Sequence, residues 1–95
     1  MKTNASAKQA RYEHEKRDLK RFAAKIAAWA RDGKRWDAEG NHEMAKVNAR
    51  DTQELTCIYN AIQRGDYQSA AAMARRLDTI VRDQIPVRLY NAINQ

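Results

Sequence analysis

The sequence predicts an all-α protein: a small antiparallel three-helix bundle with a long basic N-terminal helix and a short fourth helix at the C-terminus. Three observations lead to this fold class. The 95 residues include 17 alanines, and the charged and polar residues are dominated by types that favour helices. Only three glycines and one proline supply the turns that an all-β chain would need. Apolar residues also recur at helical spacing over several segments.

The apolar core is expected to be thinner than the 43% of hydrophobic residues suggests. Leu, Ile, Val and Phe account for only 14 of the 95 residues, and alanine supplies most of the remainder. A chain of this length buries a modest fraction of its surface, so each large apolar side chain matters. The length allows one helical domain at most, over residues 1–95.

The first helix is expected to begin near Ser6, which has the spacing of a capping box with Gln9. Its apolar residues fall on one face: Tyr12, Leu19, Phe22, Ala23, Ile26 and Ala30. Residues 1–15 are expected to fray unless they meet a partner or a second copy, which leaves 16–31 as the firm part of the helix. Gly33 is expected to end it in a left-handed conformation, and 32–40 to form a polar loop.

Residues 41–85 are predicted to form an αα-hairpin. Asn41 and Asp66 are good N-caps for its two helices, and Gly65 ends the first of them. The expected inward faces are Met44, Val47, Asp51, Leu55, Ile58 and Ile62 on the first helix, and Ala70, Met73, Leu77, Ile80, Val81 and Gln84 on the second. Pro86 ends the second helix, because proline disfavours the helical conformation of the residue before it. Residues 86–95 then form a short helix that turns Val87, Tyr90 and Ile93 inward.

The turn of this hairpin is also similar to a known motif. Gly65, Asp66 and Tyr67, followed by Ala70, resemble the inter-helix turn of a tetratricopeptide repeat. The resemblance covers about six residues, and the sequence contains no second copy of them. That family prefers other residues at four positions: Cys57, Ile58, Leu77 and Arg82. The resemblance therefore supports an αα-hairpin and not membership of the family.

Positive charge is concentrated in the N-terminal third of the chain. Residues 1–35 carry a net charge of +7 and residues 36–95 carry −1, which together make the total of +6. Such an asymmetry indicates a polyanionic partner. The alternative is a solvated helix face, neutralised by ion pairs at helical spacing: Arg11–Glu15, Glu13–Arg17 and Asp18–Arg21.

The candidate binding surface combines the basic face of the first helix with the expected tryptophan loop. Its residues are Lys16, Arg17, Lys20, Arg21, Lys25, Trp29, Arg31, Lys34, Arg35 and Trp36. Indole and guanidinium groups hold bases and phosphates and also anchor protein interfaces, so this combination indicates binding. For Trp29, at the edge of the apolar face, capping the open end of the bundle is the alternative.

We expect neither an enzyme nor a cofactor or metal site. The chain has no Ser/His/Asp set and no glycine-rich phosphate loop. One cluster has metal-ligand residue types, but a helix break separates its members: Asp37, Glu39, His42 and Glu43. Asp51, in the middle of an apolar face, is expected to pair with a cation from another helix or with backbone amides. A role in fixing the helix register or in contacting a partner is the alternative.

The expected function is docking on the acidic surface of a larger host protein or complex, as an accessory regulator or inhibitor of the kind that phages and plasmids encode. Nucleic-acid binding of low sequence specificity by the same surface is the alternative, and a homodimer is compatible with both. The single cysteine, Cys57, forms no intrachain disulfide, and no segment approaches the about 20 apolar residues of a membrane span. With no secretory signal at the N-terminus, these features predict a cytoplasmic protein that does not bind membranes.

Overall fold

The computed structural model describes residues 12–95, and every regular element within them is a helix. The all-α class is therefore confirmed. The elements are α2 (Glu15–Ala38), α3 (His42–Gln63), α4 (Tyr67–Arg75), α5 (Thr79–Arg82) and α6 (Val87–Ile93). The start expected near Ser6, and the fraying expected before Tyr12, lie outside the described residues.

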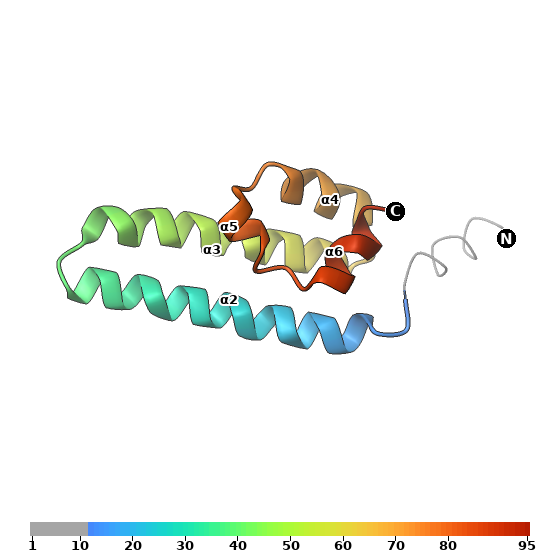
Figure 1. Cartoon of the computed structure of the whole chain (residues 1–95), viewed down its shortest axis with the longest axis horizontal. Coiled ribbons are helices and arrows are strands. Elements are labelled where there is room, and N and C mark those ends of the chain that lie inside the picture. The colour runs from blue at the N-terminus through green and yellow to red at the C-terminus, as the bar shows by residue number, and fades with distance from the viewer. Residues whose placement is uncertain (1–11) are drawn as a thin grey trace, which may run out of the picture.

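Two long antiparallel helices form the frame of the molecule. Figure 1 shows α2 and α3 side by side, with α4, α5 and α6 packed over one part of this hairpin. The end where α2 connects to α3 extends beyond the three short helices (Figure 1). We call this end, residues 29–51, the hairpin tip. The short helices therefore complete the expected bundle along only part of the length of the hairpin.

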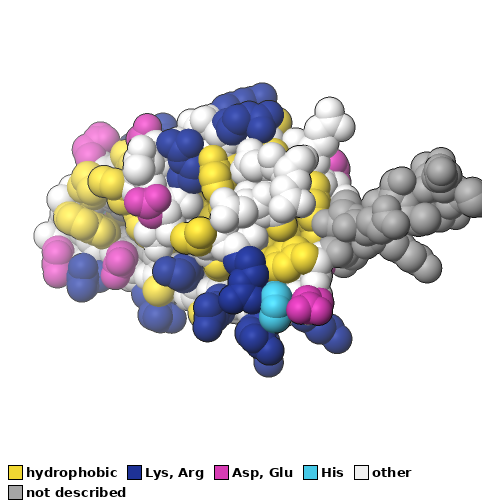
Figure 2. Space-filling model, turned by 45° about the vertical axis from the view of Figure 1, so that its right-hand side comes forward, with side chains coloured by type: hydrophobic (Ala, Val, Ile, Leu, Met, Phe, Trp, Pro, Cys, Tyr) yellow, Lys and Arg dark blue, Asp and Glu magenta, His cyan; other side chains and the backbone are white. Residues whose placement is uncertain are grey.

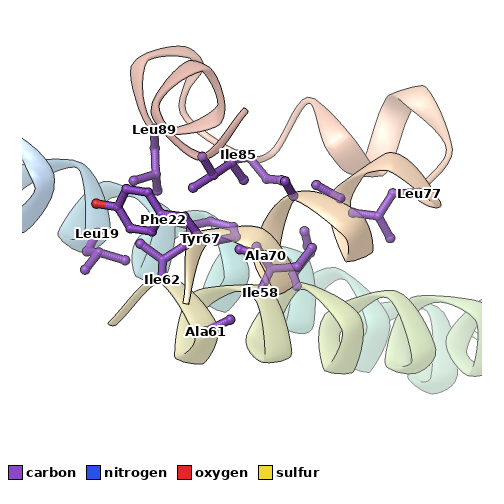
Figure 3. Close-up of a cluster of buried hydrophobic side chains, with 14 of the residues drawn as sticks. Leu19, Phe22, Ile58, Ala61, Ile62, Tyr67, Ala70, Leu77, Ile85 and Leu89 are labelled. Atoms are coloured by element: carbon purple, nitrogen blue, oxygen red, sulfur yellow. The ribbon is translucent and has the colours of Figure 1, made fainter. Parts of the chain in front are cut away.

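The hydrophobic core lies where the short helices cover α2 and α3, away from the hairpin tip. Figure 3 shows Leu19 and Phe22 of α2 facing Ile62 of α3, with Leu89 of α6 above them. The largest apolar side chains that are fully buried belong to this core: Phe22, Leu55, Ile58, Ile62 and Leu89. Small residues of α4, among them Ala70, allow that helix to approach α3 closely.

The turn between α3 and α4 forms as predicted. Gly65 has a left-handed backbone with φ 81°, and the Asp66 N–H donates to the Ala61 carbonyl at 2.8 Å. The Asp66 carboxylate accepts from the Ser69 N–H at 3.2 Å, and hydrogen bonding to Ser69 lowers the pKa of Asp66. Asn41 caps α3 in the same way. Both N-cap predictions are confirmed.

The loop predicted over 32–40 is wrong, because α2 continues through most of it to Ala38. The left-handed glycine is Gly40, with φ 87°, and Gly33 lies buried in the middle of the helix. A β carbon on Gly33 would lie 2.5 Å from the Asn48 Oδ1 of α3. Glycine is therefore needed here for the close approach of two helices, whereas the sequence alone suggested the end of one.

The second helix of the predicted αα-hairpin is divided in two. α4 ends at Arg75, and Asp78 has an extended backbone with φ −61° and ψ 153° before α5 begins. The break redirects the chain while Leu77 and Val81 stay buried on its two sides. Ile80, expected inside, is 70% exposed because it follows this change of direction.

The short C-terminal helix is confirmed as α6, but the predicted inward face is partly wrong. Leu89 and Ile93 are buried, Tyr90 is half-buried and Val87 is 75% exposed. A spacing of four residues and a spacing of three both keep side chains on one face of a short helix. The packing against the hairpin selects the first of these spacings.

Tyr67 connects the start of α4 to the start of α2. Its ring is buried, and its hydroxyl donates to the carboxylate of Glu15. Hydrogen bonds to charged groups contribute more than neutral ones, so we expect Tyr67→Phe to lower the free energy of unfolding by about 1.5–3 kcal/mol. Urea unfolding followed by circular dichroism measures the change. Tyr90→Phe is the control, since the Tyr90 hydroxyl has no hydrogen bond within residues 12–95, and an equal loss in both variants would contradict the prediction.

Candidate functional site

A row of cations covers the solvent-facing side of α2. All eight members are exposed: Lys16, Arg17, Lys20, Arg21, Lys25, Arg31, Lys34 and Arg35. At 100° per residue they span about half of the helix circumference, over roughly 28 Å of helix length. Figure 2 shows Lys and Arg side chains gathered along the α2 side of the molecule. We call these eight residues the cationic stripe.

The two carboxylates at the start of α2 face the interior and do not neutralise the stripe. Glu15 is buried and accepts the hydrogen bond from Tyr67. Asp18 is only 2% exposed, accepts from the Tyr12 hydroxyl at 2.8 Å and lies 4.0 Å from the Arg88 Nε of α6. Burial and the hydrogen bond to Asp18 raise the pKa of Tyr12. These two acids therefore serve the packing of the helix and leave its outer face positive.

The ion pairs predicted at helical spacing would have made the stripe a neutral, solvated face, but they are not found among the described residues. Two of them, Glu13–Arg17 and Asp18–Arg21, are not formed, and the third includes Arg11, which lies outside the described residues. Within residues 12–95, Arg35 is the one stripe member with a carboxylate inside 4.0 Å, that of Asp32 at 3.9 Å. The positive charge of the stripe is therefore available to a partner.

A groove extends the stripe toward the C-terminal helix. It has a volume of about 510 Å³, and Arg21 and Lys25 on one side face Arg88 and Pro86 on the other. Asp18 lies at its base, and Asp83 at its edge. Sequence reasoning missed Arg88, since no local pattern connects this residue of α6 with the stripe. Three cations around one hollow can hold an anionic group by charge-assisted hydrogen bonds.

The tryptophans do not belong to the stripe. Trp36 lies on α2 and not in a loop, and Trp29, seven residues earlier, shares its face of the helix. Both half-buried indoles line a hollow of about 180 Å³ between α2 and α3. We call this site the tip hollow, and its lining is completed by Asp32, Met44, Val47, Asn48 and Asp51. The prediction that Trp36 lies in a loop is therefore wrong, and both tryptophans line a hollow beside the stripe.

Other candidate chemistry is limited in the part of the chain that the structure describes. His42 Nδ1 lies 2.6 Å from Asp37 Oδ1 across the α2–α3 turn. Within residues 12–95, no three or more His, Cys, Asp or Glu side chains are grouped closely enough to hold a metal ion. None of the described helices combines the length and the apolar character needed to cross a membrane.

Comparison with protein-family models, curated proteins and solved structures finds no match to this chain. The described residues offer two distinct surfaces: the cationic stripe with the Arg88 groove, and the tip hollow.

Proposed function

We propose that this protein is a non-enzymatic docking module that binds an acidic surface of a larger assembly through the cationic stripe and modulates that assembly. The observation that carries the proposal is the inward orientation of Glu15 and Asp18. A helix that needed only solubility could place its acids between its outer cations, where they add stability through pairs four residues apart. Here the acids are buried, and seven of the eight exposed cations have no carboxylate within 4.0 Å among residues 12–95, which favours an interaction with an external anion.

The shape of the stripe favours a protein partner over a nucleic acid. The outer side chains between its cations are small ones such as Ala24 and Ala27. Tyr59 lines a hollow beside Lys16 and Lys20 but is half-buried against the core, so little aromatic surface is available to stack on a base. Acidic side chains, among them Asp37 and Glu39, gather where the stripe ends at the hairpin tip. They would repel the phosphates of a duplex that continued along the helix axis, whereas an acidic protein patch can match the stripe alone.

The test is a binding titration with a glutamate-rich helical peptide that carries a fluorescent label, followed by anisotropy at 50 mM salt. We expect Arg17→Glu/Lys20→Glu to weaken binding at least about tenfold, because like charges then face each other across the interface. The matched control is Lys46→Glu/Arg76→Glu, which changes the charge equally at exposed positions outside the stripe. Failure of the wild-type protein to bind the peptide, or equal losses in both variants, would contradict the proposal.

Nucleic-acid binding remains the second candidate, and the length of the stripe is the observation that favours it. Roughly 28 Å of exposed cations can follow several phosphates in succession. For a 20-base-pair duplex, the logarithm of the affinity would fall with the logarithm of the salt concentration by about 0.9 per phosphate contacted. This candidate replaces the first if the duplex still binds at 150 mM salt when the acidic peptide no longer does.

A further inference from the structure

The hairpin tip leaves open a face that is covered along the rest of the hairpin. Met44 and Val47 continue the inward face of α3 toward the tip, yet they are 41% and 42% exposed. The three short helices do not extend over them (Figure 1). Figure 2 shows hydrophobic side chains at this end of the molecule, with Asp and Glu side chains around them. The tip therefore presents an apolar surface, and two carboxylates, those of Asp32 and Asp51, line the hollow within it.

Asp51 is an unusual component of this surface, because its carboxylate is largely withdrawn from water. The residue is 7% exposed, and the one cation within 4.0 Å in the described chain is the Arg50 guanidinium, at 3.8 Å. Arg50 precedes it on the same helix and is mostly exposed, so the expected pairing with another helix is wrong. Burial raises the pKa of Asp51 above its usual value, and the nearby Arg50 guanidinium offsets this in part. A cation that entered the tip hollow would supply it.

The lining of the tip hollow fits one particular cation. The indoles of Trp29 and Trp36 can hold a flat guanidinium by cation–π attraction, and Asp32 and Asp51 can accept its hydrogen bonds. Apolar walls suit the aliphatic stem of a long basic side chain. The volume of about 180 Å³ is below the roughly 300–1,000 Å³ of sites for small-molecule ligands. We propose that the tip hollow binds one arginine side chain that a basic segment of a partner protein presents.

The charges of this site exclude the other occupants. Arg35 and Arg50 lie within 4.0 Å of Asp32 and Asp51 but do not line the hollow. The lining therefore holds two acids and no cation, which favours a cationic occupant over a phosphate. A second copy could insert an arginine of its own cationic stripe into the hollow. That contact would join two different surfaces, so each pair of molecules would keep one free stripe and one free hollow, and further copies would add to form an open chain. The proposal is independent of the docking function of the stripe, because none of the eight stripe residues lines the hollow.

Intrinsic fluorescence provides a direct measurement, because the chain has only two tryptophans and both line the hollow. The probe is an acetylated, amidated decapeptide of arginine, leucine and glycine. The control peptide carries citrulline in place of arginine, which keeps the shape and removes the charge. We expect a saturable change of tryptophan emission with the arginine peptide, and binding at least tenfold weaker with the citrulline peptide.

The matched variants are Asp51→Asn and Glu13→Gln, which remove one negative charge inside the hollow and one at an exposed position far from it. We expect Asp51→Asn to weaken binding of the arginine peptide at least tenfold and Glu13→Gln to leave it within twofold. Loss of fold does not account for this result, because a neutral amide removes a poorly compensated buried charge. The proposal is overturned if Asp51→Asn binds as wild type does, if both peptides bind equally, or if sedimentation shows self-association that Asp51→Asn abolishes.

Discussion

Phe22→Ala is expected to lower the free energy of unfolding by about 3–5 kcal/mol, which is a large share of the roughly 5–15 kcal/mol that a domain of this kind has in total. Phe22 is fully buried, and its ring lies 6.0 Å from that of Tyr59, centroid to centroid. It is the single phenylalanine of a chain with few large apolar residues. The side chains around Phe22 are held by their own packing in the core, so most of the cavity should persist.

Two further variants show whether the loss of stability is specific to the buried position of Phe22 or follows from shortening any apolar side chain. Phe22→Leu keeps most of the apolar volume and should cost about 1 kcal/mol. Val47→Ala, at the open hairpin tip, should change stability by less than about 0.5 kcal/mol, since Val47 is already substantially exposed. Urea unfolding followed by helical circular dichroism measures all three. Similar losses for Phe22→Ala and Val47→Ala would show that the tip contributes to stability as much as the core does.

Gly33→Ala is the second substitution with a large expected effect, and its sign is informative. Alanine normally stabilises a helix by about 1 kcal/mol relative to glycine. The new β carbon would lie 2.5 Å from Asn48 Oδ1 and 3.3 Å from Asn48 Cβ, so Asn48 must move. Asn48 is buried and also accepts a hydrogen bond from the Thr52 hydroxyl. Because overpacking costs about 1–3 kcal/mol, it offsets the helical gain, and we expect a net loss of stability of up to about 2 kcal/mol.

A double-mutant cycle with Asn48→Ala tests the cause directly. In that background the obstructing side chain is gone, and Gly33→Ala should stabilise the protein by up to about 1 kcal/mol. A reversal of sign between the two backgrounds identifies the contact between the helices as the reason for the glycine. If Gly33→Ala stabilises the protein in both backgrounds, the two helices tolerate the larger residue and the explanation is wrong.

The elements of this protein that follow local rules could be predicted from its sequence. The caps at Asn41 and Asp66 and the left-handed turn at Gly65 depend on residues within one helical turn of each other, so a single segment contains the necessary information. The same is true of the helical spacing that places Leu55 and Ile58 on one face of α3, in the core. The all-α class follows because these local signals agree with the composition.

The candidate site was predictable only in its parts. The basic residues of α2 are evident from charge, and the stripe that they form follows from helical spacing. Neither reveals that Glu15 and Asp18 face inward, since the acids could equally pair with cations one turn away. Arg88 joins the stripe only because α6 packs against α2, at a distance of many residues along the chain.

Local patterns in the sequence were sufficient to predict the all-α class, the caps at Asn41 and Asp66, and the excess of positive charge on α2. Only the packing of the helices showed that Gly33 permits two of them to touch, and that the chain breaks between α4 and α5 while Leu77 and Val81 stay buried. It also placed Trp29 and Trp36 in a hollow between α2 and α3. The physical reason is that a helix places neighbouring residues on different sides, and packing against the other helices decides which side meets the core and which meets a partner.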